Sequence, residues 1–193
     1  MNRQEFLFKH IKNGKILDIG NLGDGGTNHL AIIKKFSEAD IHGIDSENQE
    51  KYRLAFNNQY QGRAEDLPFA DAEFDYVYCG EILEHTWEPK KIIDECYRVL
   101  KSSGLLILDT PNIYSLSRMV KYIFTGKDNI LGDPTHKIFY SRSMLENLIK
   151  KSGFEMVEIL SDRKFTLKGR NYYLPNFGSF VYLGEHLLIT AKK

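Results

Sequence analysis

The sequence predicts an α/β fold, with a mainly parallel sheet that carries helices on both faces. Short apolar runs, typical of strands buried on both faces, alternate with longer segments that have the spacing of amphipathic helices. The connections between these segments are short, which favours parallel strands joined by right-handed crossovers. Glycines or acidic residues directly follow several of the apolar runs. In sheets of this kind ligands bind outside the carboxyl ends of the strands, so we expect a binding site there.

The composition limits the class of protein further. A chain of 193 residues suggests one domain, over residues 1–193, with a core large enough to fold without disulfide bonds or structural metal ions. Basic and acidic side chains number 26 each, so the formal net charge is zero and nucleic acid is not expected as a partner. We find neither an apolar run of membrane-spanning length nor a signal-peptide pattern, and therefore expect a cytoplasmic protein without stable membrane insertion. Cys79 and Cys96 form no CxxC motif, which argues against a disulfide framework or a zinc knuckle.

The N-terminal part of the chain predicts a helix followed by the element around which the rest is organised. Residues 1–13 have apolar side chains at helical spacing up to Gly14. The run 16–19 then predicts a buried strand, in which the carboxylate of Asp18 needs a partner. Four glycines crowd the turn 20–26, and strand, glycine turn and helix in this order predict a ligand site.

The helix after the glycine turn is expected to begin at Thr27 as N-cap and to bury the stripe Leu30, Ile33 and Phe36. A second strand follows at 41–45 and ends in Asp45. A carboxylate at this place can accept hydrogen bonds from both hydroxyls of a ribose. Residues 48–57 predict a polar helix.

The middle of the chain predicts two further strands and a helix. Residues 74–79 form the third strand, and Gly80 permits a sharp turn after it. Pro89 suits the first position of a helix that buries Ile92, Ile93, Cys96, Val99 and Leu100. The turn 101–104 leads to a fourth strand at 105–108, and Thr110-Pro111-Asn112 marks an abrupt exit from it.

Two segments interrupt this rhythm and are expected on the substrate side, at 113–140 and 165–182. Residues 114–124 predict an amphipathic helix, and the segment 113–140 either covers a substrate or is an excursion that serves packing. Ser141 predicts the N-cap of the last helix, which buries Met144, Leu145, Leu148 and Ile149 and ends at Gly153. Residues 154–160 and 183–191 predict the last strands. The aromatic segment 172–182 between them lines the cavity, forms a contact of a possible homodimer, or caps the core.

The motifs resemble a known family when they are taken in order. These are ILDIG with the glycine turn, HGID, AEDLPFADAEFDYVYCGEILEH, YRVLKSSGLLILDTPN and HKIFYSRSMLENLIKKSGF. Together they resemble the class I S-adenosylmethionine-dependent methyltransferases, in the branch of small-molecule enzymes with the LPF…FD…EVLEH pattern. The resemblance covers residues 14–160 and implies a Rossmann-like, doubly wound sheet of seven strands with an antiparallel last strand.

The resemblance also implies a cofactor, S-adenosyl-L-methionine, and a set of residues that bind it. The loop with Gly20, Asn21, Gly23 and Gly25 would pass beneath the methionine part, while Asp18 would hold this loop and the cofactor's amino group. Asp45, with Ser46 beside it, would take the ribose hydroxyls. Ala64 and Glu65 match the segment beside the adenine. The methionine end would be flanked by Cys79, Gly80 and Glu81.

Three departures from the family pattern stand out. The glycine turn is one residue longer than the usual Gly-Cys-Gly-x-Gly, which puts the path of the loop in doubt. The usual acid before the Ala-Glu pair is replaced by Arg63, which donates hydrogen bonds but accepts none, so Glu65, Asp66 or a backbone carbonyl must substitute. The turn Lys-Pro-Gly-Gly is replaced by Lys-Ser-Ser-Gly at 101–104, a conservative change.

Methyl transfer is an in-line displacement in which the protein mainly aligns donor and acceptor. A hydroxyl acceptor benefits from a base such as histidine, and His85 and His136 are the candidates. Either residue has a structural alternative, since His85 can organise its loop and His136 can cap the last helix. The six histidines lack the HExxH or paired spacing of a metal site, so no metal is expected.

Other functions fit the sequence less well. A nicotinamide-dependent oxidoreductase requires G-x-G-x-x-G after the first strand, whereas residues 20–26 give G-x-x-G-x-G-G. The alternative that remains is a non-catalytic, methyltransferase-like binding or regulatory subunit, because Arg63 and the altered turn affect the cofactor site. The sequence therefore predicts a methyltransferase for a small-molecule acceptor, with a hydroxyl as the acceptor group.

Overall fold

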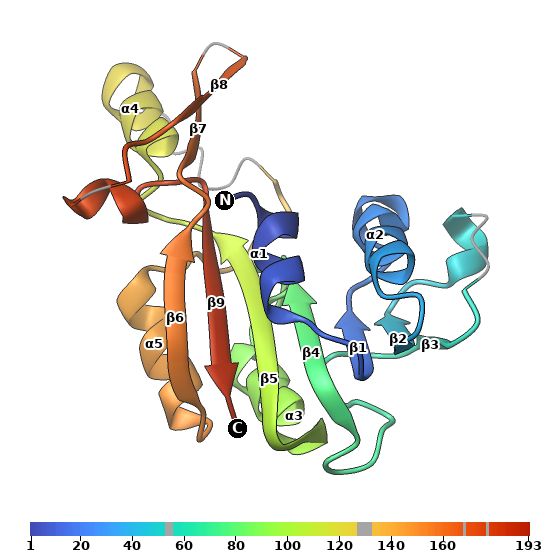
Figure 1. Cartoon of the computed structure of the whole chain (residues 1–193). Coiled ribbons are helices and arrows are strands. Elements are labelled where there is room, and N and C mark those ends of the chain that lie inside the picture. The colour runs from blue at the N-terminus through green and yellow to red at the C-terminus, as the bar shows by residue number, and fades with distance from the viewer. Residues whose placement is uncertain (53–55, 127–132, 168, 177) are drawn as a thin grey trace.

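A computed structural model describes residues 1–52, 56–126, 133–167, 169–176 and 178–193. In these residues seven strands form one mixed sheet in the order β3-β2-β1-β4-β5-β9-β6 (Figure 1). The strands are β1 Lys15–Ile19, β2 Asp40–Asp45, β3 Gln59–Gln61, β4 Phe74–Gly80, β5 Leu100–Pro111, β6 Glu155–Ser161 and β9 His186–Lys192. β9 is antiparallel to both of its neighbours, β5 and β6, while the other pairings are parallel. The predicted fold class is therefore confirmed.

Helices cover both faces of this sheet, and the sheet separates two hydrophobic clusters, one on each face. The α-helices are α1 Arg3–His10, α2 Thr27–Lys35, α3 Pro89–Val99, α4 Leu116–Thr125 and α5 Arg142–Lys151. On one face α3 and α5 pack on the sheet, with Ile93 and Leu145 in a cluster that includes Val77. On the other face α1 and α2 contribute Phe6 and Ile32 to a second cluster. Because β1 alternates between these clusters, its apolar run has no solvent-facing side.

The register of the parallel strands brings the predicted site residues to one edge. Ile19 pairs with both Ile44 and Cys79, and Gly80 pairs with Asp109. The strands therefore end side by side, and the residues that follow them lie at one edge of the sheet. This alignment is the reason why the predicted site residues come together.

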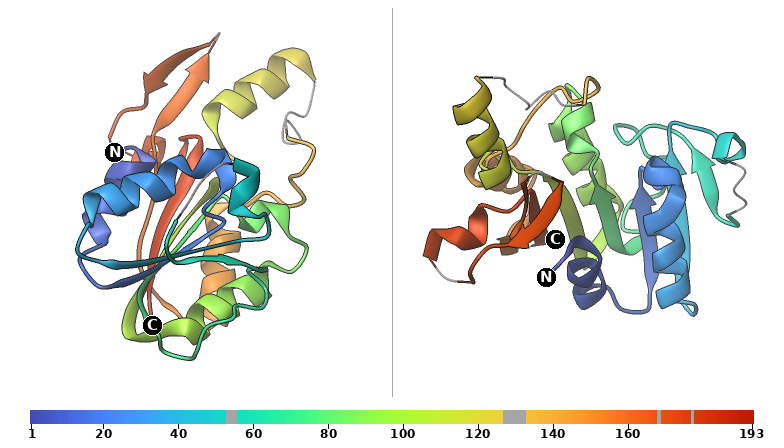
Figure 2. Two further views of the ribbon diagram at one scale, coloured as in Figure 1. Left: turned by 90° about the vertical axis from the view of Figure 1, so that its right-hand side faces the viewer. Right: turned by 90° about the horizontal axis from the view of Figure 1, so that it is seen from above.

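Helix and hairpin from the two segments expected on the substrate side lie beyond the carboxyl ends of the parallel strands (Figure 1). α4 stands there beside an antiparallel hairpin, formed by β7 Lys164–Leu167 and β8 Arg170–Tyr173. The view from above places both elements over the β5-β9-β6 side of the sheet, away from β2 and β3 (Figure 2). The hairpin was not expected, because each of its strands has only four residues and residues 170–173 do not alternate between apolar and polar side chains.

Several local predictions about helices are wrong. Gly26, with φ +75°, is the N-cap of α2, and Thr27 is the first helical residue. The buried side chains of α2 are His29 and Ile32, whereas Leu30 is 48% exposed. The reason is that His29 turns inward to meet the buried Asp18.

Other boundaries also differ from the predictions. A 3₁₀ turn at Gln49–Tyr52 stands at the start of the predicted polar helix, residues 53–55 of which lie outside the described residues. The fourth strand is longer than 105–108: it spans 100–111 and holds the turn 101–104 as an irregularity in its pairing with β4. The last strand begins at His186, and Met144 is exposed although it was expected in the buried stripe of α5. Ser141 is the N-cap of α5, as predicted.

α4 differs most from an ordinary amphipathic helix. It buries no residue, and its apolar side is exposed at Met119, Tyr122, Ile123 and Phe124.

No helix of the part of the chain that the structure describes is long and apolar enough to cross a membrane. Residues 127–132, part of the predicted insertion after α4, lie outside the described residues.

Candidate functional site

A cavity of about 530 Å³ lies at the carboxyl ends of β1, β2 and β4. Its volume falls within the range of small-molecule binding sites. Most of the predicted site residues line it, namely Asp18, Gly20, Asn21, Gly23, Asp45, Ser46, Ala64, Glu65, Gly80, Glu81 and His85. Gly25, Cys79 and His136 are not among the lining residues. The side chain of Cys79 is fully buried and contacts Cys96 in the core, because it points from β4 toward α3.

The glycine turn forms one wall of the cavity and is tied closely to β2. Gly20 has φ +73°, and a Cβ there would collide with the side chain of Ile82, so the turn requires glycine at this position. The Gly20 amide donates to the carbonyl of Ile44 at 2.7 Å. The amide of Leu22 donates to Asp45 Oδ2 at 3.0 Å. The longer turn is therefore anchored at its start and in its middle.

The residues that lengthen the turn also hold it to β3. Leu22 is fully buried, and the carboxamide of Asn21 exchanges two hydrogen bonds with that of Gln59, at 2.6 and 3.0 Å. A Cβ at Gly43 would collide with the Asn21 side chain, so β2 makes room for this pair. The insertion that distinguishes this turn from the family pattern thus forms a defined contact across the sheet edge.

Asp18 has the partner that its burial requires. Its Oδ2 lies 2.8 Å from Nδ1 of His29, and both side chains are almost completely buried. Sequence reasoning missed His29 because it belongs to the next element, α2, and the sequence does not show which side of that helix faces Asp18. The pair joins the end of β1 to α2 and thereby supports the base of the glycine turn.

The far wall of the cavity carries the residues that follow β2 and β3. Asp45 Oδ1 accepts the amide of Glu47 at 2.9 Å, so both of its oxygens already hold backbone groups and the carboxylate is fixed in orientation. Glu65 Oε1 accepts the hydroxyl of Thr86 at 2.8 Å and lies 3.4 Å from the guanidinium of Arg63. Glu65 lines the cavity while Asp66 does not. Of these two carboxylates, Glu65 is therefore the better substitute for the acid that Arg63 replaces.

The methionine end of the predicted site is enclosed by a network of charged groups that the sequence did not reveal. Arg3, from α1, lies 3.3 Å from Glu81 and 2.7 Å from Asp109. His186, on β9, lies 3.0 Å from Glu81 and 2.8 Å from Asp162. These five residues come from five separate parts of the chain, so only the fold brings them together.

The network sets the charge of its members. Burial by itself would raise the pKa of Glu81, but His186 and Arg3 outweigh it and lower this pKa to about 2. Burial would likewise lower the pKa of His186, whereas its hydrogen bonds to Asp162 and Glu81 raise it to about 9. Glu81 also has a backbone φ of +52°, which is unusual for a residue with a side chain. An ionised carboxylate is therefore held at the edge of the cavity in a fixed position.

Comparisons with known proteins agree with this geometry. A family model described as "Methyltransferase domain" matches residues 17–108, which include the glycine turn, Asp45 and the strand before Glu81. Residues 17–108 thus match a methyltransferase domain, which supports a class I S-adenosylmethionine-dependent methyltransferase.

Individual relatives place this methyltransferase domain in context. The chain is 31% identical over 99 residues to a probable S-adenosylmethionine-dependent methyltransferase from Mycolicibacterium smegmatis, which covers 51% of this chain and 35% of the relative. It is 28% identical over 173 residues to a ubiquinone biosynthesis O-methyltransferase from Hydrogenovibrio crunogenus, which covers 81% of this chain and 69% of that one. The first curated relatives are longer proteins, of which this chain spans about a third.

The fold of the methyltransferase domain is shared with solved structures. A crystal structure from Thermotoga maritima, titled as an S-adenosylmethionine-dependent methyltransferase and possible histamine N-methyltransferase, superposes with a TM-score of 0.69. It is 20% identical and the match covers all of this chain and 88% of that one. At this identity the likeness concerns the fold.

The cavity fits S-adenosylmethionine, the cofactor of the methyltransferase domain. The missing Cβ at Gly20 lets the turn pack directly against Ile82, and both residues line the cavity. Asp45, the last residue of β2, and Glu81, directly after β4, also line it, and each carries a carboxylate. These groups suit the hydroxyls and the amino group of the cofactor.

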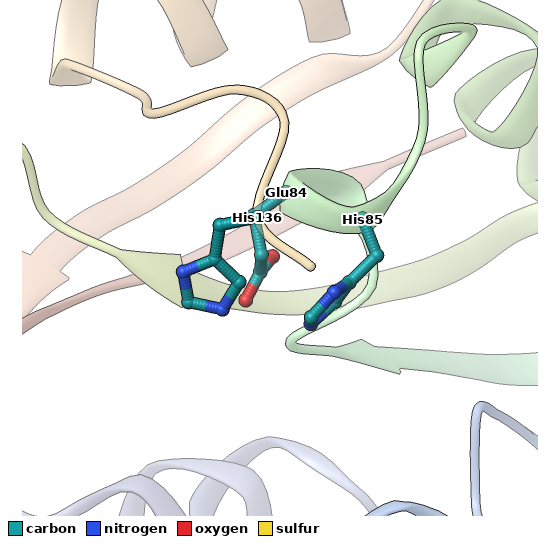
Figure 3. A group of neighbouring side chains, drawn as sticks. All are labelled: Glu84, His85 and His136. Carbon is teal, nitrogen blue, oxygen red and sulfur yellow. The ribbon is translucent and has the colours of Figure 1, made fainter. Parts of the chain in front are cut away.

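The two candidate catalytic histidines lie together, which the sequence spacing did not indicate. The ring centroids of His85 and His136 are 4.7 Å apart, and Glu84, between β4 and α3, lies against both (Figure 3). The two residues are 51 positions apart in the sequence, and only the fold brings them together. Burial and the neighbouring His85 lower the pKa of His136, so its ring is neutral near pH 7.

Proposed function

We propose that this protein transfers a methyl group from S-adenosylmethionine to a hydroxyl of a small molecule. The observation that carries the proposal is that one cavity is lined both by the cofactor residues Gly20 and Asp45 and by a histidine, His85. Methyl transfer needs the acceptor to meet the cofactor within such a shared space, since alignment and approach supply most of the rate enhancement.

Residues at the carboxyl ends of four strands, β1, β2, β3 and β4, would bind the cofactor. The turn after β1 would pass beneath the methionine part, and Asp45 would accept the ribose hydroxyls. Ala64 and Glu65 would lie beside the adenine. Glu81, kept ionised by Arg3 and His186, would accept from the amino group together with Asp18.

The side chains near the expected acceptor support a hydroxyl as the acceptor group, in a partly apolar molecule. When bound, S-adenosylmethionine supplies a methyl group on a positively charged sulfur, so the acceptor needs little activation beyond loss of its proton. His85 lines the cavity and His136 lies beside it, so either could take the proton of an acceptor hydroxyl, a task that suits a neutral imidazole. The relative from Hydrogenovibrio crunogenus is named as an O-methyltransferase, which supports oxygen as the acceptor atom.

The exposed apolar side chains of α4 and the hairpin, Tyr122, Ile123, Phe124 and Tyr173 among them, support an apolar part in the acceptor. The same surface would serve the homodimer considered from the sequence. Sedimentation velocity of the wild type and of Phe124→Ser decides this point, because a dimer formed by α4 loses stability in the variant.

The test is a calorimetric titration with S-adenosylhomocysteine, with NAD as the comparison ligand. We expect saturable one-to-one binding of S-adenosylhomocysteine and none of NAD. A transfer assay with tritiated S-adenosylmethionine then screens hydroxylated aromatic compounds, sugars and amines as acceptors. Binding without transfer to any acceptor would favour the non-catalytic subunit, and absence of binding would refute the proposed cofactor site.

A further inference from the structure

Glu84, His85 and His136 form a cluster with the donor atoms of a metal site. One candidate ligand atom from each of the three residues lies within 4.8 Å of the other two. Figure 3 shows the carboxylate of Glu84 between the two imidazole rings. Ligands on opposite sides of a first-row metal ion stand about 4 Å apart, because each bond measures about 2.0–2.2 Å. Small side-chain rotations therefore suffice to close the set around an ion.

The carboxylate of Glu84 is oriented and yet incompletely satisfied. The hydroxyl of Thr110 donates to Oε2 at 2.9 Å. Among the described residues Oε1 has no hydrogen-bond partner, although it is buried and the residue as a whole is 0% exposed. A buried carboxylate oxygen without a partner is costly, so this atom suits a cation or a donor that the described residues do not supply.

His85 is prepared to bind through one defined nitrogen. The hydroxyl of Thr135 donates to Asp133 Oδ1 at 2.6 Å, so its oxygen is left to accept a hydrogen bond. His85 Nδ1 lies 2.9 Å from this oxygen and must therefore be the donor. The proton is fixed on Nδ1, which leaves the lone pair of Nε2 available. Outer hydrogen bonds of this kind orient most histidine ligands of metals.

His136 is held beside the other two residues by the backbone. The carbonyl of Glu84 accepts the amides of Lys137 and Ile138, at 2.7 and 3.3 Å. Nδ1 of His136 is buried and has no hydrogen-bond partner in the part of the chain that the structure describes. The segment after the insertion is thus fixed directly on the turn that carries Glu84 and His85, and the three side chains need no large rearrangement to act together.

We propose that Glu84, His85 and His136 bind one divalent transition-metal cation. Two imidazole nitrogens and one carboxylate oxygen suit Mn²⁺, Fe²⁺, Co²⁺ or Zn²⁺, whereas Mg²⁺ and Ca²⁺ prefer oxygen ligands. His85 lines the cofactor cavity, so an ion held by these residues would lie at the edge of that cavity. This role for the ion rests on the proposed methyl transfer, in which it would bind the acceptor oxygen and ease loss of its proton. The binding of the ion itself does not depend on it.

The experiment is a titration of tag-free, chelator-treated protein with Co²⁺, followed by visible absorption, and by competition with Zn²⁺ and Mg²⁺. We expect one equivalent to bind, Zn²⁺ to displace it and Mg²⁺ to fail at equal concentration. His136→Ala should weaken Co²⁺ binding at least about 10-fold. Thr135→Val, which removes the acceptor for His85, should weaken it by about 10- to 100-fold.

Two controls keep the result decisive. His10→Gln removes an imidazole that lies 3.0 Å from a carboxylate, Glu158, outside the cluster, and should bind Co²⁺ like the wild type. Glu84→Gln tests the carboxylate, and circular dichroism melting shows whether this buried variant folds. If it does not fold, His136→Ala and Thr135→Val still decide. No stoichiometric Co²⁺ binding by the wild type, or equal binding by His136→Ala, Thr135→Val and the wild type, would overturn the proposal. Since neither cofactor nor acceptor is present, a failure of methyl transfer leaves this result unaffected.

Discussion

Replacing His186 with glutamine tests whether the charged network at the end of the cavity stabilises the fold. His186 joins the carboxylates of Glu81 and Asp162, which come from the turn after β4 and the end of β6. Glutamine can keep one hydrogen bond but carries no charge at any pH. The variant therefore removes the charge of the imidazolium while the surrounding strands keep their pairing.

The magnitude follows from the pKa of His186, which rises from its ordinary 6.5 to about 9 in the folded protein. At about 1.4 kcal/mol for each pH unit, this difference corresponds to about 3 kcal/mol of stability. Because the folded pKa is the higher one, the folded state binds the proton more tightly than the unfolded chain. The contribution is therefore complete below pH 6.5 and is lost as the pH rises to about 9.

Urea unfolding followed by circular dichroism, at pH 6, 7, 8 and 9.5, measures this contribution. The difference in unfolding free energy between the wild type and His186→Gln should shrink by about 3 kcal/mol from the lowest pH to the highest. Glu81→Gln, which removes one of the two carboxylates, should reduce this pH dependence. A difference that stays constant over the whole pH range would refute the assignment of a protonated His186.

Other predictions concern the cofactor cavity. Asp45→Ala should weaken S-adenosylhomocysteine binding by about 100-fold, since hydrogen bonds to charged groups contribute about 1.5–3 kcal/mol each, while Asp40→Ala, at the other end of β2, should leave binding unchanged; calorimetric affinities within threefold for both variants would contradict this. Gly20→Ala should abolish binding or lower the melting temperature, because its Cβ collides with Ile82 and its φ is +73°; wild-type values in both measurements would contradict the loop geometry. His136→Ala should retain cofactor affinity and reduce kcat at least about 100-fold in the transfer assay, and an unchanged kcat would exclude it from the reaction.

The fold class could be predicted because its signals are local. Apolar runs such as 16–19 and 74–79 fit only strands covered on both sides, and the order of strands and helices then limits the topology. Asp45 was found for the same reason, since a carboxylate directly after a buried strand lies at the ligand edge of a parallel sheet.

The predictions that are wrong concern contacts between distant segments. Leu30 was expected inside from helical spacing alone, yet α2 is rotated so that His29 reaches Asp18. Phe124 was expected on the apolar side of a helix, which it is, but its side chain is 83% exposed, because the described residues bury no residue of α4. Helical periodicity tells which residues share a face and not what the face contacts.

The sequence by itself determined the alternation of strands and helices, the need for glycine in the first turn, and the acid at the end of β2. Each of these depends on the backbone and side chain of residues close together in the chain. Only the tertiary structure decided which groups meet across the sheet: Arg3 and His186 at Glu81, and His136 at Glu84 and His85. These contacts join residues separated by about 50 to 100 positions, and their formation depends on strand order and register, which no short stretch of sequence encodes.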